Sequence, residues 1–317
     1  RIDQSSINSR ARFAHYGQPL EQLTLMGALS YELNNKLSFG LGGAVLVNSD
    51  LALAVQVPVI SGDEELASDL KWTLNPTASL YAGLRYQHDD ALTLGASVRT
   101  SLYHKLDATA FTTVEVAGVL LDVDILLEAV SWYSPLQASL GAEYQFGTRA
   151  RATADLSWYH LSADPGPYVR ISPLDPEDGI AADLNFPPEE SFGARDIVVP
   201  RVAFELDASR TLQLRTGASY RPSSIDIPTA DQRANLLDGD LATLALGIGY
   251  ELDPPPLRNA NVPKASAASA LHIDVHARVH HMAEQSVSKA VEDEEPYDYR
   301  FGGTSFDLGV TLSAGWD

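Results

Sequence analysis

Strict alternation of apolar and polar residues constrains this chain more than any other feature of its sequence. From Trp72 to Tyr86, one set of alternate positions is apolar, including Leu74, Leu80 and Leu84, while the other set is polar or small. Because successive side chains of a strand point to opposite faces, this segment predicts a long strand with one hydrophobic face. A soluble β-sandwich seldom keeps the alternation this regular for so long.

The same alternation recurs along the whole chain. We expect strands over residues 4–16, 22–33, 37–47, 72–86, 91–104, 136–146, 149–161, 196–207, 210–221, 241–252, 269–282 and 305–316. Residues 108–133 fit either two further strands or part of one long loop, and bacterial single-chain barrels have even strand numbers, so this stretch supplies two strands or none. We take two, which predicts an all-β fold: a transmembrane antiparallel up-and-down β-barrel of 14 strands, with 12 as the alternative.

Connection lengths predict the orientation of this barrel. Short turns are expected at 34–36, 88–90, 147–148 and 208–209, and long loops at 162–194, 222–240 and 283–299. Short turns face the periplasm in such barrels and long loops face the exterior. An interfacial girdle is expected from aromatic residues at the strand ends beside the short turns: Tyr31, Tyr86, Phe146, Phe204, Tyr250 and Trp316.

We expect a single barrel domain over residues 1–317. Within it, residues 1–20 form a short N-terminal segment or the first strand, and the Pro-rich stretch 253–268 forms an insertion on the periplasmic side. The chain begins at Arg1 without a signal sequence, which indicates a mature or trimmed form of an exported protein.

Composition excludes several classes of protein. A net charge of −20 argues against nucleic acid as a partner, because phosphate binding requires clustered Lys and Arg. No 18 consecutive apolar residues occur, so a membrane helix is excluded. An enzyme is not expected either, since the Gly-x-Ser-x-Gly motif of a serine hydrolase is absent and Gly40-Leu41-Gly42-Gly43 lacks the helix that a nucleotide-binding loop requires.

The polar faces of the expected strands predict a charged lumen. Its lining would include Arg85, Arg99, Glu143, Arg151, Asp155, Arg201, Glu205, Arg215, Glu251, His272, Asp274 and His276. The last three share one face of a strand, but neighbours about 7 Å apart on a strand are too far apart to ligate one tetrahedral ion without distortion. We therefore expect neither a metal nor a cofactor.

Four stretches resemble the FadL/TodX family of outer-membrane transporters for long-chain fatty acids and hydrophobic compounds. They are 74–80 followed by 91–96, 135–146 with 149–158, 212–220 with 233–250, and 302–312. The resemblance implies a barrel plugged by an N-terminal hatch, from which hydrophobic ligands leave sideways beside a kinked strand. About 20 residues precede Gln22 and they lack an Asn-Pro-Ala motif, so a full hatch is not expected.

The expected function is passive transport of small hydrophobic molecules, such as a fatty acid, an aromatic hydrocarbon or an apolar metabolite, across the outer membrane of a Gram-negative bacterium. The expected partners are outer-membrane lipid, lipopolysaccharide and a small hydrophobic ligand, with the protein acting as a monomer. Two alternatives stay open: a water-filled diffusion porin, and a structural or adhesion barrel that uses its long acidic loops.

Two groups of residues are candidates for the transport route. Gly40, Gly42 and Gly43 either form a strand kink that opens the wall as a lateral gate or make room for neighbouring lumen side chains. The candidate substrate pocket consists of Leu46, Tyr81, Leu184, Phe186, Pro187 and Phe192.

Overall fold

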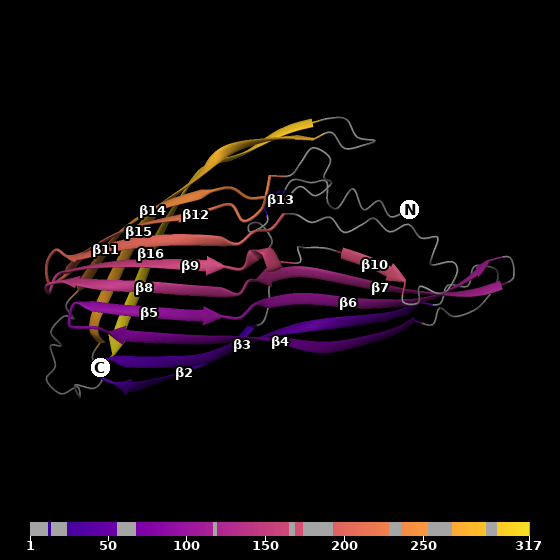
Figure 1. Cartoon of the computed structure of the whole chain (residues 1–317), viewed down its shortest axis with the longest axis horizontal. Helices are drawn as coiled ribbons and strands as arrows, with labels where there is room; N and C mark the ends of the chain where they lie inside the picture. The colour runs from indigo at the N-terminus through magenta and orange to yellow at the C-terminus, as the bar shows by residue number, and fades with distance from the viewer. Residues whose placement is uncertain are drawn as a thin grey trace.

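One long, curved sheet makes up most of the described part of the protein in the computed structural model. The model describes residues 12–13, 24–55, 68–116, 119–164, 169–173, 193–227, 236–252, 268–289 and 297–316. Fourteen strands join in the order β10-β7-β6-β3-β4-β5-β8-β9-β11-β12-β14-β15-β16, with β2 paired to β3 (Figure 1). Over these residues, no helix has the length and apolar character needed to cross a membrane.

The strands have the following bounds: β1 (Arg12–Phe13), β2 (Thr24–Asn34), β3 (Leu37–Val55), β4 (Ser68–Gln87), β5 (Leu92–Arg99), β6 (Leu102–Val116), β7 (Val119–Ser134), β8 (Gln137–Phe146), β9 (Ala150–Tyr159), β10 (Val169–Pro173), β11 (Ile197–Asp207), β12 (Leu212–Arg221), β13 (Leu236–Leu237), β14 (Leu241–Leu252), β15 (Ala268–Lys289) and β16 (Tyr297–Trp316). A short 3₁₀ helix, η1 (Leu161–Ala163), follows β9.

The count of fourteen strands is confirmed, but one member differs from the expectation. Residues 108–133 do supply two strands, β6 and β7, which form an antiparallel hairpin. The expected strand over 4–16 is described only at Arg12–Phe13, where β1 pairs in parallel with β13 outside the main sheet; the rest of that range lies outside the described residues. The fourteenth place is taken by β10, which pairs with β7.

Most neighbouring strands of the sheet are antiparallel and consecutive in the chain, as the alternation of short and long connections predicts. The β6–β7 hairpin departs from this order: β5 pairs with β8, β7 pairs with β10, and β6 pairs in parallel with β3 through residues 51–54 and 108–111. Likewise, β9 pairs with β11 rather than with β10. Within the described part of the chain, no pairing joins β2 to β16, so these two strands are edges and the sheet is not closed. The Pro-rich stretch 253–267 lies outside the described residues.

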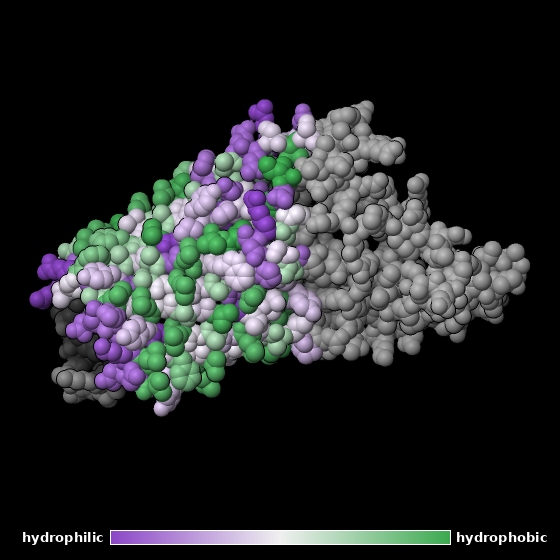
Figure 2. All heavy atoms as spheres, in the orientation of Figure 1, coloured by the Kyte–Doolittle hydropathy of each residue, from purple (hydrophilic) through white to green (hydrophobic). Residues whose placement is uncertain are grey.

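The sheet has a hydrophobic outer face. Along β14, the apolar residues Leu244, Leu246 and Ile248 alternate with half-buried small residues and are 53 to 65% exposed. Leu308 on β16 is 75% exposed. Figure 2 shows hydrophobic side chains spread over the strands, with hydrophilic ones at the end that carries the short turns and again toward the opposite end. So much exposed apolar surface is typical of strands that face lipid.

Candidate functional site

The inner face of the sheet carries the polar residues that the alternation assigns to it. In register across the sheet, Arg85 pairs with Gly95, Gly95 with Gly141, Gly141 with Asp155, and Asp155 with Arg201. All twelve expected lumen residues occupy positions of this face, alternating along their strands with the exposed apolar residues: Arg85, Arg99, Glu143, Arg151, Asp155, Arg201, Glu205, Arg215, Glu251, His272, Asp274 and His276.

Ion pairs cross the inner face in one continuous ladder near the short turns. Arg151 on β9 contacts Glu205 on β11 at 2.8 Å, and Arg215 on β12 contacts the same carboxylate at 3.1 Å. Arg215 also reaches Asp274 on β15, at 2.5 Å, although β14 lies between their strands. We define these four residues as the charge ladder. The paired charges make this part of the interior polar without a large excess of either sign.

Two glycines of β14 make room for the contact between Arg215 and Asp274, which crosses that strand. Arg215, Gly247 and His276 are in register, as are Gly249 and Asp274. A side chain on Gly249 would place its Cβ 2.8 Å from the Asp274 Oδ1 atom, and one on Gly247 would lie 3.5 Å from the Cβ of Arg215. The absence of side chains therefore leaves the space through which Arg215 crosses β14.

The histidines of β15 lie along the same wall. His280 bonds Thr243 through Nδ1 and Asp307 through Nε2, both at 2.9 Å. The ring of His276 lies against Gly309, where an added Cβ would come within 2.4 Å of its Cε1 atom. No group of three or more His, Asp or Glu residues able to hold a metal ion occurs among the residues described.

Apolar residues replace the charges on the inner face toward the loops. Ile197 and Val199 of β11 are buried with Leu161 of η1 in one cluster, against which Tyr159 packs. Leu46 of β3, one of the expected pocket residues, is fully buried. Ile197 and Val199 were missed by alternation alone, because they belong to a run of apolar residues in which neither face is polar.

The remaining expected pocket residues divide into two groups. Tyr81 lies half-buried on the inner face of β4, in register with Gly42 and Arg99. Leu184, Phe186, Pro187 and Phe192 lie outside the described residues.

The three glycines of the expected gate lie in a regular part of β3. Pairing with β2 and with β4 runs without a register shift through Gly40, Gly42 and Gly43. A Cβ on Gly42 would come within 2.8 Å of the Gly27 carbonyl oxygen, whereas one on Gly40 would meet only the Leu29 carbonyl oxygen, at 3.5 Å. Gly42 therefore lets β2 approach β3 closely, within a stretch of regular pairing on both sides.

A row of small residues crosses the inner face at the level of Gly40. In register it runs through Ser30, Gly40, Gly83, Ser97, Ser139 and Ser157. The row forms the floor of a depression of about 490 Å³. Arg201 holds two of the lining residues, since its guanidinium donates to Asp155 at 2.9 Å and to Ser157 at 3.0 Å, and it also donates to Tyr159 at 3.0 Å.

The expected girdle residues lie on the outer face near the short turns. Tyr31, Tyr86, Phe146, Phe204 and Tyr250 are all exposed, and Tyr144 packs edge-on against Phe146 with ring centroids 4.7 Å apart. Trp316 ends β16, and its side chain lies outside the described residues.

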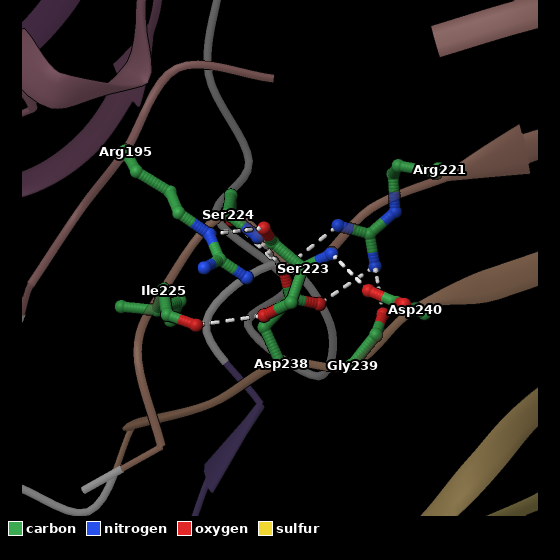
Figure 3. A network of polar contacts seen from close by, with 8 residues as sticks. All are labelled: Arg195, Arg221, Ser223, Ser224, Ile225, Asp238, Gly239 and Asp240. Atoms are coloured by element: carbon green, nitrogen blue, oxygen red, sulfur yellow. Dashed lines mark hydrogen bonds and ion pairs between the residues drawn. The ribbon is translucent and has the colours of Figure 1, made fainter. Parts of the chain in front are cut away.

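A polar network fixes the connection between β12 and β14 (Figure 3). Arg221 donates to both carboxylate oxygens of Asp238, at 2.6 and 2.9 Å, and the amide and hydroxyl of Ser224 donate to the same group at 2.8 Å. Arg195 donates its Nε proton to the Ser223 carbonyl at 2.9 Å. The Asp238 side chain is 1% exposed. A buried, fully paired carboxylate of this kind holds the loop in one arrangement.

A second polar cluster caps β9 and β11 outside the strands. The Ser162 amide and hydroxyl donate to Asp196, at 3.0 and 2.7 Å, and His160 lies 3.0 Å from the same carboxylate and stacks on Trp158. Partial burial alone would raise the pKa of Asp196. The hydrogen bonds from Ser162 and His160 outweigh that effect and lower the pKa from 3.8 to about 2.

Acidification should therefore weaken this corner of the protein. Because the pKa of Asp196 is lower in the folded state, its contribution to stability is present above pH 3.8 and is lost as the pH falls toward 2. We expect Asp196→Asn to lower the urea midpoint of unfolding at neutral pH and to show a smaller further loss between about pH 5 and pH 2 than the unmodified protein. Equal acid sensitivity of the two proteins would contradict this assignment.

Comparison with known proteins places the fold. No family model matches the chain, and no curated protein matches it. Among solved structures, a FadL homologue from Pseudomonas aeruginosa has a TM-score of 0.57 and 17% identity, over 93% of this chain and 68% of that chain. The toluene transporter TodX from P. putida has a TM-score of 0.47 and 15% identity, over 92% and 69%. TbuX, a toluene transporter from Ralstonia pickettii, has a TM-score of 0.45 and 16% identity, over 93% and 69%.

The similarity to the FadL homologue, at 17% identity and a TM-score of 0.57, shows the fold alone. The chain has the antiparallel up-and-down β-barrel fold of the FadL homologue, which confirms the expected fold class. The resemblance found in the sequence is confirmed at the level of fold.

Proposed function

We propose that this protein is an outer-membrane channel of a Gram-negative bacterium for passive transport of small hydrophobic molecules. The observation that carries the proposal is the change of the inner face from apolar near the loops, at Leu161, Ile197 and Val199, to charged near the short turns. A hydrophobic site with few polar groups suits a fatty acid, an aromatic hydrocarbon or an apolar metabolite. The fold shared with a FadL homologue supports the same class.

Lateral release is the second part of the proposal. An apolar solute that moved along the axis would meet the charge ladder, whose groups lose hydration without gaining a partner when an apolar molecule displaces water. Release into lipid through the wall at β2 and β3, beside Gly40, avoids that cost. The exposed apolar outer face of β2, including Leu29 at 84%, provides a surface continuous with lipid.

Uptake and conductance together test the proposal. We expect cells that carry the protein to accumulate a labelled fatty acid or toluene faster than cells without it, while the purified protein conducts ions poorly in planar bilayers. A large and steady conductance without hydrophobic uptake would identify a diffusion porin instead. Adhesion with neither activity would support a structural barrel.

Substitution of Gly40 tests lateral release by itself. Gly40→Val should slow hydrophobic uptake about tenfold, because its side chain would fill the depression beside β2 while the nearest backbone atom, at 3.5 Å, leaves room for folding. Gly217→Val on β12 is the control and should leave uptake unchanged, since Gly217 lies outside the depression and a Cβ there would lie 3.3 Å from the nearest backbone atom, the Val202 carbonyl oxygen. Equal uptake by the Gly40→Val and unmodified proteins would exclude release at this wall.

A further inference from the structure

The hairpin of β15 and β16 contains a bulge near its loop end. Pairing passes from Met282–Gly303 to Gln285–Phe301, so Ala283 and Glu284 lie opposite Gly302. Gly302 and Gly303 have φ angles of +126° and +129°, and a Cβ on Gly302 would lie 2.7 Å from the Ala283 carbonyl oxygen. The bulge therefore depends on glycine, and one extra residue in β15 shifts the side chains that follow to the opposite face.

Polarity reverses at this bulge. In the part of the hairpin between the bulge and the C-terminal end of β16, Phe306 and Leu308 project outward and are 76 and 75% exposed. On the inner face of the same part, His280 and Asp307 form a pair. At the bulge and just beyond it, Glu284 and Arg300 are exposed and form an ion pair at 3.4 Å. The apolar residues there turn inward instead. The hairpin therefore leaves the hydrocarbon layer at the bulge. We call residues 285–289 and 297–301, which lie beyond the bulge, the upper hairpin; its apolar side chains face the interior.

The inward residues of the upper hairpin form a buried cluster with the loop that contains β13. We define the lid cluster as Leu237, Met282, Val287 and Phe301, against which Leu241 and Tyr299 pack. Gly239 lies so close that a Cβ there would come within 2.9 Å of Met282. Next to this cluster, the Oε1 atom of Gln285 is buried and, within the described part of the chain, has no hydrogen-bond partner.

The upper hairpin lacks the strand pairing with β14 that joins the rest of the β15–β16 hairpin to the sheet. The pairing of β14 with β15 ends at Leu241–Met282, and beyond it the described residues of β15 pair only with β16. Figure 1 shows this part of the hairpin separating from β12 and β14 at the top of the view. Packing of the lid cluster against Leu237 and Leu241 joins it to the loop, which the Arg221–Asp238 pair holds in place (Figure 3). Such an element can open locally at low cost.

We propose that the lid cluster is the site at which an apolar solute with one hydrogen-bond donor enters the interior, and that the upper hairpin is its lid. The lid bends at the bulge and lifts from Leu237, the solute packs on Met282, Val287 and Phe301, and its hydroxyl group donates to the Oε1 atom of Gln285. A phenol or an alcohol fits this description. The inference rests on the proposed function and narrows its substrate class.

Cross-linking tests the lid directly, since the chain contains no cysteine. In the double variant Leu237→Cys/Val287→Cys, a short dithiol-reactive reagent or oxidation should join the hairpin to the loop, because the two residues lie in one buried cluster. We expect uptake of 1-naphthol by intact cells to fall at least about tenfold after cross-linking with a reducible reagent and to recover on reduction. Failure of the cross-link to form would contradict the packing on which the lid rests.

The matched control links the hairpin to itself. Ser288 and Asp298 are register partners, so Ser288→Cys/Asp298→Cys should join β15 to β16 without attaching them to the loop, and uptake should be unchanged. If uptake by the cross-linked Leu237→Cys/Val287→Cys protein equals uptake after the cross-link is cleaved by reduction, the lid and its site are excluded while the channel function stands. If the unmodified and reduced proteins transport no hydrophobic compound, the channel function itself fails.

Gln285 tests the class of solute. Gln285→Leu removes the buried acceptor, and we expect the ratio of 1-naphthol to naphthalene uptake to fall about fivefold, as the loss of one hydrogen bond implies. An unchanged ratio would exclude Gln285 as the acceptor for the solute.

Discussion

Asp238→Ala should lower the free energy of unfolding by about 3–5 kcal/mol, the cost of leaving one partner of a buried ion pair alone. Asp238 is 1% exposed and Arg221 is 19% exposed at the side chain, so removal of the carboxylate leaves a guanidinium largely shielded from water. The amide and hydroxyl of Ser224 lose the same acceptor. Urea unfolding of the protein folded in micelles or bilayers measures the difference.

An exposed ion pair between the same loop and the residues before β11 is the control. Arg195 and Asp226 lie 3.4 Å apart, with side chains 53 and 69% exposed. Asp226→Ala should therefore change stability by less than about 1 kcal/mol. Similar losses for the two alanine variants would show that the Arg221–Asp238 pair is not what fixes this loop, and the support for the lid would be lost with it.

Leu308→Arg should destabilise the folded protein by about 2–4 kcal/mol, because the charge would enter the hydrocarbon layer near the middle of a strand that faces lipid. Leu308 is 75% exposed in the isolated chain, and in a water-soluble protein the same change at so exposed a site would cost little. The sign and size of this effect therefore separate a membrane barrel from a soluble sheet. The measurement is the midpoint of urea unfolding in lipid bilayers.

Thr311→Arg on the same strand provides the comparison. Thr311 pairs with Asp274 on the inner face, where an added guanidinium meets water and a carboxylate. We expect a change of less than about 1 kcal/mol there. If Thr311→Arg proved as damaging as Leu308→Arg, the assignment of inner and outer faces would be wrong.

Alternation alone determined the strands, their faces and the class of fold. It identified both strands of the difficult stretch 108–133, and it placed residues as distant as Arg85 and His276 on one inner face. This succeeded because side chains of a strand alternate between two faces, and the face that contacts lipid must be apolar. Sequence also indicated the fold that comparison with the FadL homologue confirms.

The tertiary structure decided what depends on contacts between distant segments or on a break in the period. Arg215 and Asp274 stand 59 residues apart, and their pairing needs the space over Gly249 on an intervening strand. The lid cluster draws residues from β13, β15 and β16, and Val287 faces inward only because the bulge at Ala283–Glu284 shifts the alternation by one residue. Periodicity describes each strand separately, so neither a pairing across a third strand nor a local change of register can be read from it.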